Sequence, residues 1–191
     1  MHDQVAQLSQ EDRLNAEVGR LRAEVARLEG RVAELDELAH RDSLVALPNR
    51  RGFMRRLEGV VERVKRYNDG AAMLFIDLDG LKLINDSFGH KAGDEALIHV
   101  AELLTGGVRH GDCVARIGGD EFAVLLERAD ERSAYETANR LDNVIAGCEF
   151  AHDGEGLPLS VAIGVAMIGA DDDAESVMKR ADGEMYKRKA A

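Results

Sequence analysis

The sequence predicts a mixed α/β (α+β) fold, in which an antiparallel-rich central sheet is surrounded by helices and preceded by a long coiled-coil helix. Three observations predict it: a heptad pattern confined to the first 40 residues, alternating helix-length and strand-length apolar segments after them, and one acidic turn between two strand-like runs. The chain has 191 residues, of which 45% are hydrophobic. This is enough for one well-cored domain with an appendage, and too apolar for a wholly disordered chain.

Composition excludes several functional classes. The formal net charge of −11 argues against nucleic acid or an anionic membrane as a partner, because both normally require a basic face. No apolar run approaches the length needed to cross a bilayer, and the first residues carry no signal-peptide pattern. Two cysteines, Cys113 and Cys148, are too few for a disulfide framework. We therefore expect a cytoplasmic protein with no membrane span and no nucleic-acid partner.

Residues 1–40 form the first predicted unit, a coiled-coil dimerisation helix. Its valines at heptad position a and leucines at d favour a parallel two-stranded coil, although residues 1–13 lie outside the pattern. Two of the three charge pairs expected across the interface attract. The alternative is an amphipathic helix docked on its own domain, but the narrow stripe favours a homodimer. The stripe consists of Leu14, Val18, Leu21, Val25, Leu28, Val32 and Leu35.

Residues 41–191 form the second predicted unit. Their apolar segments alternate between helical spacing and short strand-length runs, and the order implies an antiparallel-rich sheet with the helices on one side. The expected helices cover 53–66, 81–88, 94–104, 133–145 and 176–188, and the expected strands cover 71–76, 114–117, 122–126 and 159–168.

Two acidic elements stand at predicted strand ends. Asp77 and Asp79 follow a buried run and, in a strand, point to the same face. The sequence GGDE at 118–121 reads as a hairpin turn, and its two glycines let the backbone approach a bulky anion closely. Paired oxygen ligands suit Mg²⁺, which commonly takes one or two carboxylates plus substrate phosphates. Taken alone, each element is more often an ordinary turn or a helix cap.

The pentapeptide GGDEF at 118–122 is identical to the signature of the GGDEF-type diguanylate cyclases, and the resemblance extends over the second unit. It implies a nucleotidyl-cyclase or ferredoxin-like palm. It also implies condensation of two GTP into cyclic di-GMP with release of two pyrophosphates, by a homodimer whose domains each hold one GTP. The other segments that resemble the family are DSLVALPNRR (42–51), DLDGLKLIND (77–86), GHKAGD (89–94), VAIGVA (161–166) and ADGEMY (181–186).

The resemblance implies a metal cofactor, Mg²⁺ or Mn²⁺. Its implied ligands are the side chains of Asp77 and Asp120 and the backbone carbonyl of Leu78. Such a metal neutralises phosphate oxygens and lowers the pKa of a bound hydroxyl. Asp120 is also implied as the acceptor of the 3′-hydroxyl proton, and Glu121 as an assistant to the metal, so these two are the implied catalytic residues.

Guanine needs an acceptor for its N1–H and 2-amino groups. Asp94 matches the family's base reader, since a carboxylate there rejects adenine, and the amide of Asn85 can both donate and accept. Lys82 and Lys189 match positions that contact the β- and γ-phosphates, whereas His90 either lines the site or makes a structural hydrogen bond at a helix junction. The residues implied to bind substrate are Lys82, Asn85, His90, Asp94, Gly118, Gly119 and Lys189.

Arg109 and Asp112 precede the GGDEF signature at the spacing of the family's inhibitory, product-binding site. Arginine suits phosphate and the Hoogsteen edge of guanine, and aspartate suits its Watson–Crick edge. Taken alone, an Arg-x-x-Asp pair is usually a loop salt bridge, so this role is implied by the resemblance. Arg140 is expected to contribute to a secondary patch from a second domain.

Two alternative functions remain open: a catalytically inactive module that binds GTP or cyclic di-GMP as a sensor, and a coiled-coil scaffold. The retained acids at Asp77, Asp120 and Glu121 argue against the first, and the Asn85–Asp94 pair argues against the second. The Gly-Arg that usually follows the closing helix in this family is absent, which predicts one phosphate-binding cation fewer.

Overall fold

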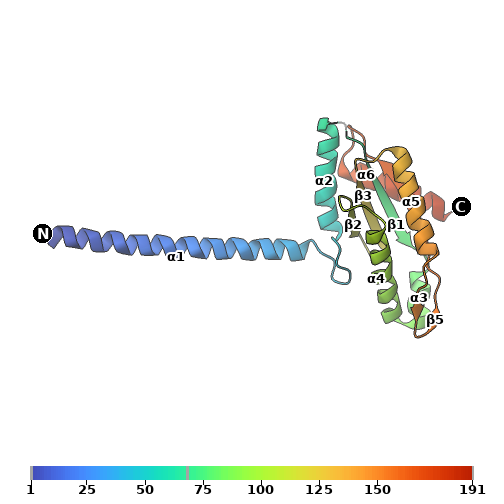
Figure 1. Cartoon of the computed structure of the whole chain (residues 1–191), viewed down its shortest axis with the longest axis horizontal. Coiled ribbons are helices and arrows are strands. Elements are labelled where there is room, and N and C mark those ends of the chain that lie inside the picture. The colour runs from blue at the N-terminus through green and yellow to red at the C-terminus, as the bar shows by residue number, and fades with distance from the viewer. Residues whose placement is uncertain (1, 68, 191) are drawn as a thin grey trace. The chain divides into compact units, whose positions relative to one another are not determined.

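The computed structural model describes residues 2–67 and 69–190 and, in the first helix, the side chains from Arg13 onward. The chain divides into two compact units, Met1–Ala39 and His40–Ala191. Helix α1 (His2–Ala39) is one continuous helix of 38 residues (Figure 1). The side chains of residues 1–12, most of the segment predicted to break the heptad pattern, lie outside the described residues.

The predicted apolar stripe of α1 is open to solvent along its described length. The exposed fractions of its seven valines and leucines range from 43% to 66%. Charged side chains one turn apart form ion pairs on the helix surface. The nitrogen–oxygen distance is 2.7 Å between Arg20 and Glu17 and 2.7 Å between Arg27 and Glu24. Exposed pairs of this kind contribute little, and a long helix in water depends mainly on packing of its apolar face.

The second unit begins with one helix and then interleaves strands with helices. Over its described residues the order is α2 (Arg50–Tyr67), β1 (Ala71–Leu78), α3 (Leu81–Phe88), α4 (His90–Gly106), β2 (Cys113–Arg116), β3 (Glu121–Glu127), α5 (Glu131–Ala146), β4 (Ala151–His152), β5 (Glu155–Gly156), β6 (Val161–Met167) and α6 (Ala174–Lys189). Four strands form one sheet in the order β2–β3–β1–β6. All its pairings are antiparallel, which confirms the predicted fold class.

Helices cover both faces of this sheet, so the expectation that they lie on one side is wrong (Figure 1). Alternate residues of β1 serve the two faces. Leu74 and Ile76 belong to the core formed with α3, α4 and α5, whereas Met73 and Phe75 belong to the core formed with α2 and α6. The continuous apolar run of β1 is typical of a strand buried on both sides.

No sequence pattern predicted the short β4–β5 hairpin between α5 and β6. Its turn residues, Asp153 and Gly154, have φ angles of 50° and 83°. A type I′ turn requires positive φ at both central positions, and Asp-Gly is a favoured pair there. Only two residues pair on each side, which is too short for a strand periodicity.

Asp42 stabilises the turn that opens the second unit. Its Oδ1 atom accepts the N–H groups of Leu44 and Val45, both over 2.9 Å, and lies 3.2 Å from the guanidinium of Arg116. Both charged side chains are less than one-fifth exposed. Burial alone raises the pKa of Asp42, but the two backbone N–H groups and Arg116 outweigh it, so the pKa lies below its ordinary value.

We expect Asp42→Asn to lower the free energy of unfolding by about 1–3 kcal/mol at neutral pH, because Arg116 loses its charged acceptor. A carboxyl group whose pKa is depressed by folding stabilises above its unfolded-state pKa, and this contribution is lost as the pH falls through the folded-state value. Urea unfolding should therefore show a smaller difference between wild type and variant at about pH 3 than at neutral pH. An equal difference at both pH values would contradict the ion-pair explanation.

Candidate active site

Acidic side chains gather at one end of the sheet, where β1 ends beside the turn that joins β2 to β3. Asp77 lies directly opposite Glu121 in the β1–β3 register. The backbone N–H of Leu78 donates to the carbonyl of Asp120 over 2.9 Å. The antiparallel pairing thus brings together the three acids that the sequence pattern had placed in two separate elements.

Lys189, the last residue of α6, reaches this acidic cluster. Its ammonium donates a hydrogen bond to Asp77 and lies 3.8 Å from Oδ1 of Asp79. Asp79 is fixed in turn by the hydroxyl of Ser160, which donates to Oδ2 over 2.9 Å. Lys189 therefore stands beside the carboxylates, within reach of an anion bound there.

The cluster carries more negative charge than Lys189 neutralises. Burial raises the pKa of Asp77, the charge of Asp120 adds to the rise, and Lys189 opposes it without cancelling it. Burial likewise raises the pKa of Glu121, with further contributions from Asp77 and Asp120. Like charges held together favour the binding of either protons or a cation, which compete for the same oxygens.

The donor atoms at this end of the sheet fit Mg²⁺ or Mn²⁺, which prefer carboxylate and carbonyl oxygens. In the part of the chain that the structure describes, no three His, Cys, Asp or Glu side chains are arranged to hold a metal by themselves. Two carboxylates with one backbone carbonyl leave positions for phosphate oxygens, which is how proteins commonly hold Mg²⁺.

The turn between β2 and β3 has the predicted hairpin form. The N–H of Ile117 donates to the carbonyl of Glu121 over 2.8 Å, and the guanidinium of Arg116 donates to the carbonyl of Gly119 over 2.8 and 3.2 Å. A Cβ at Gly118 would lie 2.6 Å from a carboxylate oxygen of Glu121, whereas a Cβ at Gly119 would meet nothing within 4 Å. Gly118 therefore makes room for Glu121, and Gly119 borders open space.

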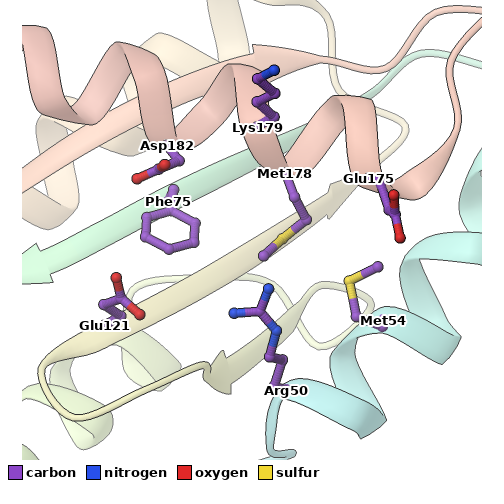
Figure 2. Close-up of a pocket in the computed structure, with 8 residues that line it drawn as sticks. All are labelled: Arg50, Met54, Phe75, Glu121, Glu175, Met178, Lys179 and Asp182. Carbon is purple, nitrogen blue, oxygen red and sulfur yellow. The ribbon is translucent and has the colours of Figure 1, made fainter.

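A cavity of about 520 Å³ adjoins this turn on the α2–α6 face of the sheet. Figure 2 shows Phe75, Glu121 and Arg50 pointing into it from β1, β3 and α2. The charge of Arg50 opposes the burial and the neighbouring acids that raise the pKa of Glu121. Arg50 lies in the 42–51 segment that resembles the family, but the sequence pattern assigned it no role. The cavity is lined by Arg50, Met54, Phe75, Glu121, Glu175, Met178, Lys179 and Asp182.

Asn85 and Asp94 lie on either side of the junction between α3 and α4. The side-chain oxygen of Asn85 is buried and has no hydrogen-bond partner in the structure. It lies against Gly93, where a Cβ would come within 2.1 Å of it. Asp94 follows Gly93 directly and is exposed. A buried acceptor without a partner is costly, so a donor on a bound ligand would stabilise this junction.

Lys82 and His90 are exposed in the first turns of α3 and α4. Among the described residues the His90 side chain makes no hydrogen bond, so its alternative structural role at the helix junction lacks support. Lys82 precedes Asn85 by three residues, a spacing that places both on one side of a helix.

The loop between α4 and β2 carries the predicted inhibitory pair. The carboxylate of Asp112 accepts the backbone N–H of Arg109 over 3.0 Å and that of Glu127 over 3.2 Å. In the described part of the chain no salt bridge joins Arg109 to Asp112, and the Arg109 side chain is exposed. Arg140 of α5 donates to the carbonyl of Gly107 over 2.8 Å. The structure therefore brings Arg109, Asp112 and Arg140 to one loop.

Two arginines of α2 meet the same region, and the sequence pattern missed both. Arg56 donates to the carbonyl of Gly111 over 3.1 Å and to the carboxylate of Glu127 over 3.2 Å. Arg63 lies 2.8 Å from Glu127, and two of its guanidinium nitrogens are buried without partners. The helical period of α2 predicted its buried face, but it gave no information on which residues the rest of the helix contacts.

Residues 39–191 match the family described as "Diguanylate cyclase, GGDEF domain", and the chain belongs to this family. It is 39% identical over 152 residues to the diguanylate cyclase DgcP of Pseudomonas aeruginosa, covering 78% of this chain and 22% of DgcP. It is 39% identical over 158 residues to the response regulator PleD of Caulobacter vibrioides, covering 81% of this chain and 35% of PleD. The chain thus spans only a minor part of these relatives.

Solved structures show the same likeness. The coiled coil and GGDEF domain of DgcB from Caulobacter crescentus, in complex with c-di-GMP, has a TM-score of 0.82 at 26% identity, covering 93% of this chain and 94% of that one. A sensory box/GGDEF family protein from Caulobacter crescentus CB15 has a TM-score of 0.74 at 35% identity, covering 79% and 98%. Over the described residues, no helix is both long and apolar enough to span a membrane.

Proposed function

We propose that this chain is a diguanylate cyclase, which condenses two GTP into cyclic di-GMP and releases two pyrophosphates. The observation that carries the proposal is the cluster of Asp77, Asp120 and Glu121 beside Lys189 at one end of the sheet. Such a cluster suits a cation and the phosphates of a nucleotide. Family membership and the named activities of the relatives support the same reaction.

Each residue of the cluster has a proposed role. Asp77, Asp120 and the carbonyl of Leu78 hold Mg²⁺ or Mn²⁺, which when bound neutralises phosphate charge and makes the attacking 3′-hydroxyl more acidic. Asp120 accepts the proton of that hydroxyl, and Glu121 adds negative charge to the cation site. Lys189 leaves its carboxylate partners for the β- and γ-phosphates when GTP binds. Positioning and charge neutralisation would supply most of the rate enhancement.

The α3–α4 junction is the proposed guanine site. The buried oxygen of Asn85 would accept from the base, and the exposed carboxylate of Asp94 would accept from its N1–H and 2-amino groups. Adenine has a lone pair at N1, which faces a carboxylate unfavourably. Lys82 and His90, exposed on the same two helices, would border the phosphates and the base, and Gly118 and Gly119 would let the backbone approach the phosphates.

We propose that the enzyme acts as a homodimer joined through α1, because each domain holds one GTP and the reaction needs two. The exposed stripe of α1 supports this. A hollow of about 310 Å³ between Val18, Leu21 and Val25 is bordered by Arg22 and Glu29, as expected for a coiled-coil hole that accepts a knob from a partner helix. The proposed setting is the cytoplasm, in keeping with two free cysteines.

Incubation with GTP and Mg²⁺, followed by chromatography of the nucleotides and an assay for pyrophosphate, tests the activity. A cyclase forms cyclic di-GMP with two pyrophosphates for each molecule of product. A sensor module would bind GTP or cyclic di-GMP without turnover, and a coiled-coil scaffold would bind neither nucleotide. Either of these results would contradict the proposal.

We further propose that cyclic di-GMP inhibits the enzyme by binding at the 107–112 loop, through Arg109, Asp112 and Arg140. Two features support an anionic ligand there: the exposed side chain of Arg109, and the unpartnered guanidinium nitrogens of Arg63, which lies beside Glu127 next to this loop. The planar guanidinium group of arginine can donate two parallel hydrogen bonds to the oxygens of a phosphate.

Arg109→Ala should raise the concentration of cyclic di-GMP that halves the initial rate by about tenfold or more, since hydrogen bonds to a charged group are lost. Initial rates measured at increasing product concentration give this value. Arg132→Ala, which removes an exposed arginine of α5 that pairs with Glu136, should leave this concentration unchanged. Undiminished inhibition of the Arg109 variant would contradict the assignment.

A further inference from the structure

His152 stands out because it is the one polar residue among those described that is almost wholly buried, with 7% of its surface exposed. It lies in β4, one position before the tight Asp153–Gly154 turn. Its Nδ1 atom is 2.7 Å from Oε2 of Glu95 on α4. An ionised carboxylate only accepts, so the imidazole donates this hydrogen bond. None of the roles assigned above uses it.

A second contact joins α4 to the residue just before β4. The ring of Phe150 faces that of His99 with 5.6 Å between their centroids. Phe150 precedes His152 by two residues and His99 follows Glu95 by four, so each pair lies on one side of its element. The N–H of Leu157 donates to the carbonyl of Phe150 over 2.8 Å and closes the base of the hairpin. The β4–β5 hairpin is therefore fastened to α4 at two points.

The contact between His152 and Glu95 lies next to Asp94, the residue proposed to recognise guanine. Glu95 follows Asp94 directly in the first turns of α4. No side chain caps the N-terminus of this helix, which follows α3 after Gly89 with a φ of 85°. The start of α4 therefore lacks the usual local restraint, and the hydrogen bond from His152 restrains it from outside.

We propose that His152 is a positioning residue for guanine recognition: through Glu95 it fixes the first turns of α4, so that Asp94 faces Asn85 across the base. This inference rests on the proposed function. The other charged groups near the contact are Lys91, 3.6 Å from Oε1 of Glu95, and Asp153, 3.6 Å from Nε2 of His152. Both are exposed, so the half-buried His152–Glu95 hydrogen bond is the main restraint.

The test compares His152→Leu, which removes the donor, with His152→Asn, which keeps an N–H near the position of Nδ1. Steady-state rates are measured with GTP and with inosine triphosphate, whose base lacks the 2-amino group. His152→Leu should raise KM for GTP about tenfold with kcat within about twofold, because binding is weakened and the reacting groups are untouched. It should also lose most of the preference for GTP over inosine triphosphate, and His152→Asn should recover part of both.

Three further variants exclude a merely structural effect. Glu95→Ala removes the same hydrogen bond from the half-exposed side and provides the test if His152→Leu does not fold. Where both single variants fold, the double variant, His152→Leu with Glu95→Ala, should be no worse than His152→Leu alone, because both changes break one interaction. Glu155→Gln, an exposed change in β5 of the same hairpin, is the matched control and should leave both KM values unchanged.

The failures of this inference and of the proposed function are distinguishable. If wild type makes cyclic di-GMP while His152→Leu or Glu95→Ala keeps KM and base preference within twofold of wild type, the positioning role is overturned and the cyclase stands. If wild type makes no cyclic di-GMP, the proposed function is overturned, and calorimetric affinities for GTP and inosine triphosphate decide the positioning role instead. Absence of GTP binding to wild type would overturn both.

Discussion

Asp120→Asn should lower the formation of cyclic di-GMP from saturating GTP and Mg²⁺ by about 10³-fold or more, as expected when a preorganised charge at the reacting groups is removed. Asparagine has nearly the shape of aspartate but neither its charge nor its capacity to accept a proton. The backbone carbonyl of residue 120, which accepts the N–H of Leu78 over 2.9 Å, is retained. The fold of the turn should therefore survive while the chemistry is lost. Initial rates of pyrophosphate release measure the effect.

The thermal midpoint of the same variant separates an effect on chemistry from an effect on folding. Asp120 contributes to the raised pKa of Asp77 and of Glu121, so removing its charge relieves repulsion between like charges. The thermal midpoint should be equal to or slightly above that of wild type. Asp171→Asn, an exposed change in the loop after β6, serves as the control for both measurements. Turnover within tenfold of wild type would rule out the assigned roles of Asp120.

The sequence predicted the elements of the second unit well, because periodicity records which side chains are buried. Its failures have physical causes. The expected helix at 94–104 begins earlier, at His90, because Gly89 joins α3 to α4 directly and no capping side chain marks the start. The prediction that the helices lie on one side was wrong because the order of the elements does not specify which face a helix covers, whereas the uninterrupted burial of β1 indicates two covered faces.

The candidate site, too, was predictable from the sequence only in part. Asp120 and Glu121 were predictable because they share one short turn, and Asp77 because it ends a strand. The partners of these groups were not. Lys189 lies 112 positions from Asp77, and His152 lies 57 positions from Glu95. Such contacts arise only when the sheet and the helices assemble, so no local pattern encodes them, and resemblance supplies a residue's role without naming its neighbours.

Charged substitutions in the stripe of α1 should make cyclic di-GMP synthesis steeply dependent on protein concentration. Leu21→Glu combined with Leu28→Glu places carboxylates where the stripe is half-exposed in a single chain and would be buried between two. Each leucine buried in an interface is worth roughly 1.5–3 kcal/mol, and the added like charges repel. Without the coil the two GTP-bearing domains lose their high effective concentration. Specific activity should fall on about hundredfold dilution of the variant and stay constant for wild type.

The matched control adds the same charges to the opposite side of the helix. Ala23 and Gly30 occupy outer heptad positions, so Ala23→Glu combined with Gly30→Glu should leave both the mass and the dilution profile of wild type unchanged. Sedimentation shows whether each variant is a dimer. If the stripe variant is monomeric and its specific activity is still constant on dilution, α1 does not tether the two domains for catalysis. If it remains a dimer, the stripe is not the interface, because two charges facing their symmetry mates in a buried seam cannot be accommodated without separating the helices.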